Sequence, residues 1–320
     1  MKKAVKLSVI ILNYRTPEIT VRAFKSLDKA ASNLEIEKII VDNGSRDGSV
    51  EFIRERAPSA RIIELPENRG FAAGMNAGAR AASGDYILFM NSDVEAFPGS
   101  LNILVDYLEA NPDTGVVGPL LEDGNGKFAR TLLFQPTLLS ELVPVIGKLN
   151  LLRWERRIGT EPLEVEGVEG AAPVASRAAI EKAGLFDEDF FFYAEIEDWC
   201  LRIRRNGFKI KVIPNARMMH AREGSSREIG RPTKIEIKRA RYLLIKKSLG
   251  GFAGNLVIGT DFLSGIFKVI FYAIGYLLSM LSWKRGYKKL VMYSGLLFWI
   301  AAGMPERSAP IYRKLFGKWG

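Results

Sequence analysis

Two short stretches of the sequence combine glycines with amide and acidic side chains in an order that suits a charged ligand. Residues 68–78 form a small-residue loop that runs into a helix, and the apolar run 86–90 leads directly to Asn91, Ser92 and Asp93. Glycine lets the backbone approach a ligand closely, and a carboxylate at a strand end can hold a divalent cation against a diphosphate. The pattern therefore predicts a nucleotide-sugar site, although a packing helix followed by an ordinary turn would read similarly.

Three further apolar runs, at 7–12, 38–41 and 61–65, alternate with helical segments, and polar residues follow each run. Strand and helix alternate four times before Asp93, which indicates a doubly wound α/β domain with a mainly parallel sheet. Ligands bind at the carboxyl ends of such strands, so the polar residues there should converge. These residues are Asn13, Tyr14, Asp42, Asn43, Asn68, Arg69, Asn91 and Asp93. One polar strand end is routine, whereas four converging ends describe a site.

The segments that carry these residues resemble motifs of the family 2 inverting glycosyltransferases with the GT-A fold, particularly the bacterial branch that includes rhamnosyltransferases. The resemblance covers residues 6 to about 225, through segments 8–14, 41–45, 68–78, 91–93, 184–191 and 195–205 in that order. It implies that Asp42 contacts the nucleobase with Asn13 and Tyr14 beside it, while an Asx turn is the alternative role for Asp42. The further nucleotide-sugar contacts that it implies are Asn68, Arg69, Gly70, Asn76, Asn91 and Ser92.

The resemblance also implies a divalent cation, Mn²⁺ or Mg²⁺, held by Asp93 and His220. Asp93 matches the second acid of the family's Asp-any-Asp element, and Asn91 stands at the position of the first acid as a weaker, neutral oxygen ligand. His220 is the only histidine, and family members often carry a metal or diphosphate ligand there. The loop 222–227 resembles a phosphate-facing loop. A structural histidine is the alternative.

A second acidic group lies at the start of a predicted helix. Glu195 and Asp198 share one face of that helix, whereas Glu197 points elsewhere. An inverting transferase needs a base that takes the proton of the acceptor hydroxyl, and the helix dipole keeps such carboxylates ionised. The family often has an acid where this chain has Ile196, so the base must be one of the three remaining acids, with Glu195 and Asp198 favoured. Helix capping with an ion pair from Asp198 to Arg202 is the alternative.

Composition sets the domain organisation and the expected surroundings. Residues 1–230 are predicted to form the catalytic domain, with a nucleotide-sugar half at 1–95 and an acceptor half at 96–230. Lys and Arg exceed Asp and Glu by ten, yet no nucleic-acid-binding motif accompanies them, so we expect an anionic membrane surface as partner rather than nucleic acid. The single Cys200 excludes an intrachain disulfide framework. The first residues lack the apolar core of a signal peptide, which predicts a cytoplasmic location.

Residues 231–320 are predicted to be a basic and apolar helical extension that associates with the membrane. The run 262–283 is just long enough to span a bilayer. A small and polar stripe recurs along it at helical spacing, from Ser264 to Ser282, and a span would carry the basic turn 284–289 outward against the positive-inside rule. We therefore expect in-plane amphipathic helices on the inner face of the cell membrane. A spanning helix and an intramolecular helical hairpin are the alternatives.

Together these features predict a metal-dependent inverting glycosyltransferase. It would move a sugar, with rhamnose the leading candidate, from a nucleoside-diphosphate donor to a lipid-linked saccharide or polysaccharide in cell-envelope glycan synthesis. An inactive glycan-binding GT-A scaffold is the first alternative, suggested by Asn91 and Ile196. A nucleotidyltransferase is the second alternative. Such an enzyme would be expected to carry an Arg/Lys-rich motif in the first strand-to-helix loop, whereas residues 13–16 of this chain are Asn, Tyr, Arg and Thr. Nothing in the sequence specifies an oligomeric state.

Overall fold

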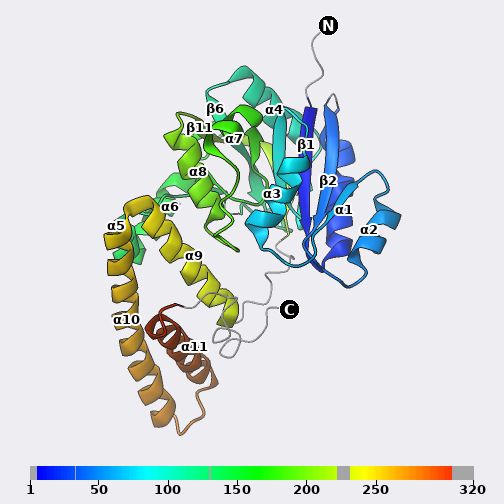
Figure 1. Ribbon diagram of the computed structural model, residues 1–320. Coiled ribbons are helices and arrows are strands. Elements are labelled where there is room, and N and C mark those ends of the chain that lie inside the picture. The colour runs from blue at the N-terminus through cyan, green and yellow to red at the C-terminus, as the bar shows by residue number, and fades with distance from the viewer. Residues whose placement is uncertain (1–5, 33, 130, 222–230, 305–320) are drawn as a thin grey trace. The chain divides into compact units, whose positions relative to one another are not determined.

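The chain forms two compact units, which are described separately below. The computed structural model describes residues 6–32, 34–129, 131–221 and 231–304 (Figure 1). Unit 1 comprises residues 1–135 and 145–228, and unit 2 comprises residues 136–144 and 229–320. The segment 136–144, which the sequence placed in the acceptor half, belongs to unit 2 because Leu138 and Leu142 pack against the apolar cluster of that unit.

A nine-stranded sheet organises unit 1, in the order β3-β2-β1-β4-β10-β6-β11-β5 with β8 paired to β11. The strands are β1 Lys6–Asn13, β2 Glu35–Asp42, β3 Arg61–Glu64, β4 Tyr86–Asn91, β5 Val94–Ala96, β6 Thr114–Glu122, β8 Leu163–Glu164, β10 Val174–Ser176 and β11 Lys209–His220. A small separate sheet pairs β7 Leu132–Leu133 with β9 Gly167–Val168. The strands β3, β2, β1 and β4 run parallel, as do β6 and β11, while β10, β5 and β8 pair antiparallel. The predicted doubly wound, mainly parallel sheet is confirmed.

Helices cover both faces of this sheet. The helices of unit 1 are α1 Pro17–Ala30, α2 Ser49–Arg56, α3 Phe71–Ala81, α4 Ser100–Ala110, α6 Pro144–Glu155, α7 Arg177–Ala183 and α8 Glu195–Arg205. One apolar cluster packs α1, α2 and α4 against the sheet, and a second cluster packs α3, α7 and α8 (Figure 1). Val9 and Ile11 of β1 enter the first cluster and Ile10 enters the second, because a central parallel strand is buried on both sides. Cys200 packs in the second cluster, where burial raises the pKa of its thiol to about 12.

The register of the strands determines which residues meet at the carboxyl edge. Asn13 lies beside Asp42 in the β1–β2 pair, and Leu12 lies beside Asn91 in the β1–β4 pair. β11 runs antiparallel to β5, which puts His220 opposite Val94. The pairing therefore brings the end of β11 next to the segment that follows β4, although more than a hundred residues separate them.

Unit 2 is helical, as predicted for the C-terminal extension. It consists of α5 Leu138–Leu142, α9 Arg231–Leu249, α10 Gly251–Leu278 and α11 Lys284–Ala301. Its core cluster joins Tyr242 of α9, Val257 of α10 and Trp299 of α11, with Leu138 and Leu142 of α5 packed against it. Within the described part of the chain, α10 is the one helix long and apolar enough to cross a membrane, and 17% of its apolar window is buried.

Part of the small and polar stripe of α10 packs against the following segment, whereas Lys268 and Ser282 of the stripe are exposed. The rings of Tyr272 and Tyr293 stack with centroids 5.8 Å apart, and a Cβ added to Gly265 would lie 2.7 Å from a methyl of Leu297. A Cβ added to Gly275 would lie 2.6 Å from the ring of Trp283. Gly265 and Gly275 therefore allow α11 and the turn before it to approach α10 closely and form a helical hairpin.

The close approach of α3 to the sheet predicts the effect of enlarging Gly78. A Cβ there would lie 2.4 Å from Ile10 Cγ2 and 3.1 Å from Val41 Cγ2, both on buried β-branched side chains. We expect Gly78→Ala to lower the free energy of unfolding by about 1–3 kcal/mol through overpacking, although alanine gains about 1 kcal/mol in helix propensity. Urea denaturation followed by circular dichroism measures the change. Gly124→Ala, where no atom lies within 4 Å, is the matched control, and equal stability of the two variants would contradict the prediction.

Candidate active site

The ends of β1 and β2 are joined by a buried polar network around Asp42. Asn13 Nδ2 donates to Asp42 Oδ1 at 2.6 Å, and its Oδ1 accepts from Thr20 Oγ1 at 2.9 Å. Ser45 donates to Asp42 twice, from Oγ to Oδ1 at 2.6 Å and from its backbone N to Oδ2 at 3.0 Å. Asp42 thus makes a local side-chain-to-backbone hydrogen bond with the residue three positions on, which is related to the Asx turn that the sequence left as an alternative, and Asn13 positions the Asp42 carboxylate instead of facing solvent.

A second network holds the Asn68 loop against the loop that follows β2. Asn43 Nδ2 donates to Asn68 Oδ1 and to Gly70 O, both at 3.1 Å, and Asn43 Oδ1 accepts from the backbone N of Arg69 at 3.0 Å. Gly70 has a φ of 90°, and a Cβ there would lie 2.3 Å from Phe191 O. Only glycine fits this position, so the loop and the aromatic segment before α8 can share the hydrogen bond from Phe71 N to Phe191 O at 2.7 Å.

Glu188 ties the glycine-rich segment to the acceptor half of unit 1. Its carboxylate accepts from Asn76 Nδ2 at 3.0 Å, lies 3.3 Å from Arg69 Nη2 and pairs with Arg80. Partial burial opposes ionisation, but the hydrogen bonds from Asn76 and Arg80 and the charges of the two arginines outweigh it and lower the pKa of Glu188 below 4.5.

Asn76 is fully occupied by structural hydrogen bonds. Its Nδ2 also donates to Phe186 O at 2.8 Å, and its Oδ1 accepts from Phe186 N at 3.0 Å. The residue is 1% exposed. We therefore assign Asn76 the role of clamping the 184–191 loop, in place of the nucleotide-sugar contact expected from the sequence.

Asp93 and His220 meet at the edge of the sheet. Asp93 Oδ1 lies 3.4 Å from His220 Nε2, both side chains are largely buried, and Ala221 N donates to Asp93 O at 3.0 Å. Asn91 Oδ1 is buried without a hydrogen-bond partner in the described part of the chain, and so is His220 Nδ1. A carboxylate, an imidazole and an amide oxygen therefore lie on neighbouring strand ends. The predicted phosphate-facing loop 222–227 lies outside the described residues.

Tyr14 and Ser92 lie at the same edge. The guanidinium of Arg15 lies 5.2 Å from the centre of the Tyr14 ring, and the backbone N of Arg15 donates to Ser45 Oγ at 2.9 Å. Ser92 Oγ lies 3.5 Å from Thr16 Oγ1. The first strand-to-helix loop is thus linked to the Asp42 network on one side and to the residue before Asp93 on the other.

Glu195 begins α8 on a backbone that departs from ordinary geometry. The two preceding residues, Tyr193 and Ala194, have φ of 72° and 66°, an uncommon conformation for non-glycine residues that often marks functional sites. Glu195 is buried at the positive end of the helix dipole. Burial raises the pKa of the Tyr193 hydroxyl, and the nearby Glu195 carboxylate raises it further. Tyr193 therefore stays protonated at neutral pH.

The other acids of α8 have different surroundings. Asp198 Oδ2 accepts from Arg202 Nε at 2.8 Å, and the Arg202 guanidinium also donates to the carbonyl oxygens of Ala183 and Leu185. The ion pair weighed as the alternative for Asp198 is therefore present, and it anchors α8 to α7. The backbone O of Glu197 accepts from Gln135 Nε2 at 2.8 Å.

Ile196 occupies a position that is buried against the strand region beside β4. A Cβ added to Gly170 would lie 2.6 Å from Ile196 Cγ1, and the neighbouring Ala171 accepts a hydrogen bond from Asn91 N at 2.9 Å. The first turn of α8 therefore lies close to the end of β4. Ile196 is part of the second apolar cluster. It therefore fills the position at which the family often carries an acid, and no cavity remains there.

Sequence reasoning missed the supporting roles of Ser45, Glu188 and Tyr193. Ser45 follows Asp42 by three residues, and such short polar side chains commonly hydrogen-bond to nearby backbone groups, which could have identified it. Glu188 lies in a motif that the analysis quoted, but no local pattern indicates that it binds two arginines of a distant helix and loop. The left-handed backbone at Tyr193 has no sequence signal, because the residue is not glycine.

The geometry agrees with comparisons to known proteins. Residues 8–181 match the family model described as Glycosyl transferase family 2, which is more than half of the chain. The chain therefore belongs to glycosyl transferase family 2 and is a glycosyltransferase. It is 26% identical over 242 residues to N-acetylglucosaminyl-diphospho-decaprenol L-rhamnosyltransferase of Mycobacterium tuberculosis, an alignment that covers 69% of this chain and 77% of the relative.

Solved structures show the same fold. A mannosyltransferase from Pyrobaculum calidifontis in complex with GDP-Man and Mn²⁺ superposes with a TM-score of 0.57 at 16% identity, covering 96% of this chain and 89% of that chain. GalNAc-T7 with UDP, GalNAc and Mn²⁺ gives a TM-score of 0.56 at 18% identity, covering 75% of this chain and 48% of that chain. This chain thus spans about half of GalNAc-T7. At such identities the likeness shows the fold alone, and it confirms the predicted GT-A fold.

The Glu188 cluster predicts a pH-dependent contribution to stability. Because the folded-state pKa of Glu188 lies below 4.5, its stabilisation is fully present above pH 4.5 and is lost as the pH falls through the folded-state value. We expect Glu188→Gln to lower the free energy of unfolding by about 1 kcal/mol or less at pH 7, since the group is partly exposed. Denaturant titrations at pH 7 and at progressively lower pH should show the difference from wild type shrink as the Glu188 carboxylate becomes protonated. Glu161→Gln, at an exposed position, is the control. A difference that persists in acid would contradict this account.

Proposed function

We propose that this enzyme transfers a sugar from a nucleoside-diphosphate donor to a lipid-linked saccharide, with inversion and with a divalent cation. The observation that carries the proposal is the 3.4 Å approach of Asp93 Oδ1 to His220 Nε2 at the carboxyl edge of the sheet. The Asp42 network lies at the same edge, two strand ends away. That arrangement suits a ligand with a nucleobase at one end and a diphosphate at the other.

The donor atoms at this edge fit a divalent cation. Two atoms that each lie about 2.1 Å from one ion at right angles are about 3 Å apart, close to the observed separation of Asp93 and His220. Asn91 supplies a buried, unpartnered amide oxygen beside them. Among the described residues there is no group of three or more His, Cys, Asp and Glu that could hold a metal, so phosphate oxygens and water would complete the shell. A bound cation supplies Lewis-acid stabilisation of the diphosphate leaving group.

The nucleobase of the sugar donor would bind against the Asp42 network. The Asp42 carboxylate is held by Asn13 and Ser45, so the carboxylate need not be reoriented when the nucleobase of the donor binds. Tyr14 and Arg15 follow Asn13 directly, and the ring with its stacked guanidinium offers a flat surface beside the network. Arg69, on the loop fixed by Asn43 and Glu188, provides a partly exposed positive charge for the phosphates.

Glu195 is the proposed catalytic base. As the oxygen of the acceptor hydroxyl attacks the anomeric carbon, Glu195 takes its proton, and the bond to the diphosphate breaks on the opposite face of the sugar. The strained backbone at Tyr193 and Ala194 fixes the start of α8 and therefore the direction of the Glu195 side chain. Asp198 is engaged by Arg202 and supports the helix as a positioning residue. Because Ile196 belongs to the core, its apolar nature does not favour the inactive scaffold.

The acceptor and the donor sugar are proposed by similarity. The mycobacterial relative is named for transfer of L-rhamnose to a lipid-linked N-acetylglucosamine diphosphate. We extend to this chain a rhamnose donor and a lipid-linked saccharide acceptor, within cell-envelope glycan synthesis. An acceptor with a lipid tail requires an enzyme that works at a membrane surface.

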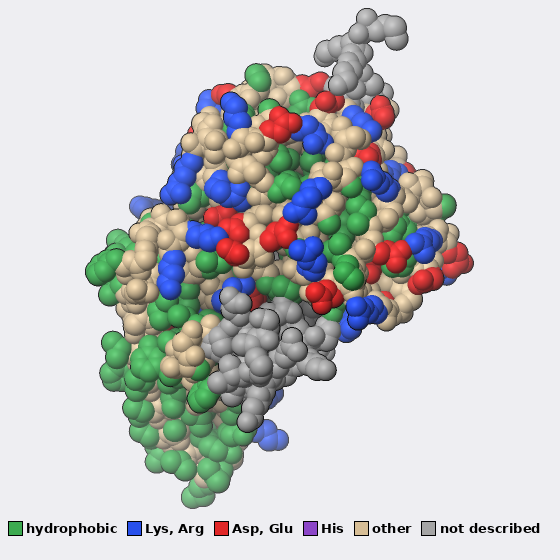
Figure 2. All heavy atoms as spheres, in the orientation of Figure 1, with side chains coloured by type: hydrophobic (Ala, Val, Ile, Leu, Met, Phe, Trp, Pro, Cys, Tyr) green, Lys and Arg blue, Asp and Glu red, His purple; other side chains and the backbone are tan. Residues whose placement is uncertain are grey.

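Unit 2 offers such a surface. Large apolar side chains emerge from one face of α10, where Figure 2 shows them gathered (Leu263, Phe267, Ile270, Phe271, Ile274, Leu277 and Leu278). Phe267 is 72% exposed and Leu278 is 81% exposed. The basic residues Lys284, Arg285, Lys288 and Lys289 follow at the start of α11. This combination supports an in-plane hairpin on the anionic inner face of the cell membrane, with the exposed face of α10 toward the acyl chains.

Asp93→Asn tests the metal site. Because a neutral amide is a weaker ligand than a carboxylate, we expect Mn²⁺-dependent binding of a nucleoside diphosphate to weaken at least about tenfold, and turnover to fall with it. Calorimetric titration with and without Mn²⁺ measures the effect, and circular dichroism checks the fold. Asp106→Asn, at an exposed position of α4, is the control. If the variant retained full Mn²⁺ dependence, the metal assignment would be wrong.

Glu195→Gln and Asp198→Asn separate the base from the helix anchor. We expect Glu195→Gln to lower kcat by about 10²–10⁴ while donor affinity is kept. Asp198→Asn should keep kcat within a few-fold but lower the free energy of unfolding by about 1–3 kcal/mol, since it weakens a charge-assisted hydrogen bond to Arg202. Transfer assays with the anomeric product read by NMR, together with denaturant titrations, make the comparison. A large loss of kcat in Asp198→Asn with normal stability would reverse the assignment.

A further inference from the structure

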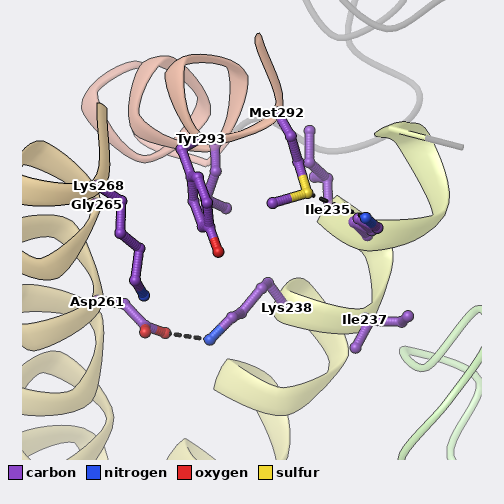
Figure 3. Close-up of a pocket in the computed structure, with 10 residues that line it drawn as sticks. Ile235, Ile237, Lys238, Asp261, Gly265, Lys268, Met292 and Tyr293 are labelled. Atoms are coloured by element: carbon purple, nitrogen blue, oxygen red, sulfur yellow. Dashed lines mark hydrogen bonds and ion pairs between the residues drawn. The ribbon is translucent and has the colours of Figure 1, made fainter. Parts of the chain in front are cut away.

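Unit 2 encloses a cavity of about 310 Å³ between α9, α10 and α11 (Figure 3). Its polar lining consists of Lys234 and Lys238 of α9, Asp261 and Lys268 of α10, and Tyr293 of α11, and the rest of its wall is mostly apolar. In Figure 3, Lys238, Lys268 and Tyr293 point toward one another across the cavity from the three helices. A mostly apolar pocket with a few convergent polar groups is the usual form of a small-molecule site.

The charges in this cavity are not balanced. Asp261 is neutralised by Lys238, whose Nζ lies 2.5 Å from Oδ2, and the same oxygen accepts from the Tyr242 hydroxyl at 2.8 Å. Lys234 Nζ has only the sulfur of Met292 at 3.1 Å, and Lys268 Nζ lies 5.2 Å from the centre of the Tyr293 ring.

Neither Lys234 nor Lys268 has a carboxylate partner among the described residues. A thioether sulfur is a weak acceptor, and a ring face is weaker for an ammonium group than an anionic oxygen. Two positive charges therefore remain available beside an apolar wall. The tyrosine hydroxyl adds a neutral donor, because burial keeps the pKa of Tyr293 above its usual range.

We propose that this cavity binds the phosphate group of an anionic lipid. Lys234 and Lys268 supply charge-assisted hydrogen bonds to the phosphate oxygens, and the apolar wall covers the first carbons of the chain. A free anion would leave that wall in contact with water, whereas a neutral amphiphile would leave the two ammonium groups without a partner. The volume lies at the lower end of ligand sites, so the cavity takes the head group and the start of one chain while the remainder stays outside.

The location of the cavity on α10 favours a lipid over a soluble phosphate ester. Asp261, Gly265 and Lys268 face the cavity, while Leu263, Phe267 and Phe271 emerge exposed from the same turns of the helix. An apolar surface that meets acyl chains would bring lipid phosphates to the level of these turns. The inference therefore concerns a site on unit 2 and does not depend on which sugar or acceptor unit 1 uses.

Binding of three small probes to the full-length protein tests the proposal. Octyl phosphate, below its micelle concentration, should bind saturably in calorimetric titrations, whereas octyl glucoside and inorganic phosphate should bind much more weakly. The double variant Lys234→Gln/Lys268→Gln should lose at least about tenfold in affinity for octyl phosphate, because each charged hydrogen bond contributes more than a factor of ten. Lys234→Arg/Lys268→Arg should retain binding. Lys25→Gln/Lys29→Gln removes the same charge at two exposed positions of α1, outside the cavity, and should stay within about twofold of wild type.

Each alternative outcome overturns the proposal in a recognisable way. Equal binding of octyl glucoside would make the cavity an apolar pocket only, and equal binding of inorganic phosphate would make it a site for a free anion. Equal losses of affinity in the cavity variant and in the Lys25/Lys29 variant would show that general surface charge, and not the cavity, binds octyl phosphate. Thermal unfolding of each variant identifies a loss of fold. Transfer by unit 1 is assayed separately with a soluble acceptor, so failure here leaves the proposed function untouched.

Discussion

The strand β11 runs antiparallel to β5, so that His220 lies opposite Val94 and the amide of Ala221 donates to the carbonyl oxygen of Asp93 at 3.0 Å. This short pairing brings an imidazole from the end of the catalytic unit to a carboxylate that follows β4. Everything proposed for the diphosphate depends on it, because Asp93 alone would be one carboxylate at a strand end. Backbone hydrogen bonds hold the two side chains, so the site is formed before a ligand arrives.

The buried polar groups around this edge are used mainly to hold one another. Asn13, Asn43 and Asn76 place their amides in networks that fix Asp42, the Asn68 loop and the 184–191 loop. A buried polar group without a partner is costly, and a fully satisfied network specifies one arrangement. The groups that approach a ligand, in the proposed function, are then few. The amides of Asn13, Asn43 and Asn76 thus hold the loops that position a small number of reactive atoms.

Unit 2 has a different organisation, in which apolar surface is left exposed and positive charge is concentrated. The outer face of α10 carries large apolar side chains. Its inner face carries glycines, which allow α11 to approach closely. The hairpin therefore directs its apolar surface outward, and the cavity beside α9 retains lysines without carboxylate partners in the described chain. A cluster of large exposed apolar side chains is uncommon on a soluble monomer, and Lys234 and Lys268 are exposed to solvent. Both fit a unit that meets anionic amphiphiles at a membrane surface.

What the sequence by itself determined follows from local periodicity. The apolar runs before Asn13, Asp42 and Asn91 predict buried parallel strands, and their polar ends predict the ligand-binding edge, because strand direction and side-chain alternation are local properties. The tertiary structure decided the roles of residues whose partners lie far along the chain. Asn76 is hydrogen-bonded to Phe186 and Asp198 is paired with Arg202, and Glu188 joins distant segments because Arg69 and Arg80 both pair with it. The sequence pattern of α10 predicts one continuous polar face, but Tyr272 of that face stacks on Tyr293 of α11 while Lys268 is exposed. A sequence pattern states which face of a helix differs from the others, and only the packed chain determines what that face meets.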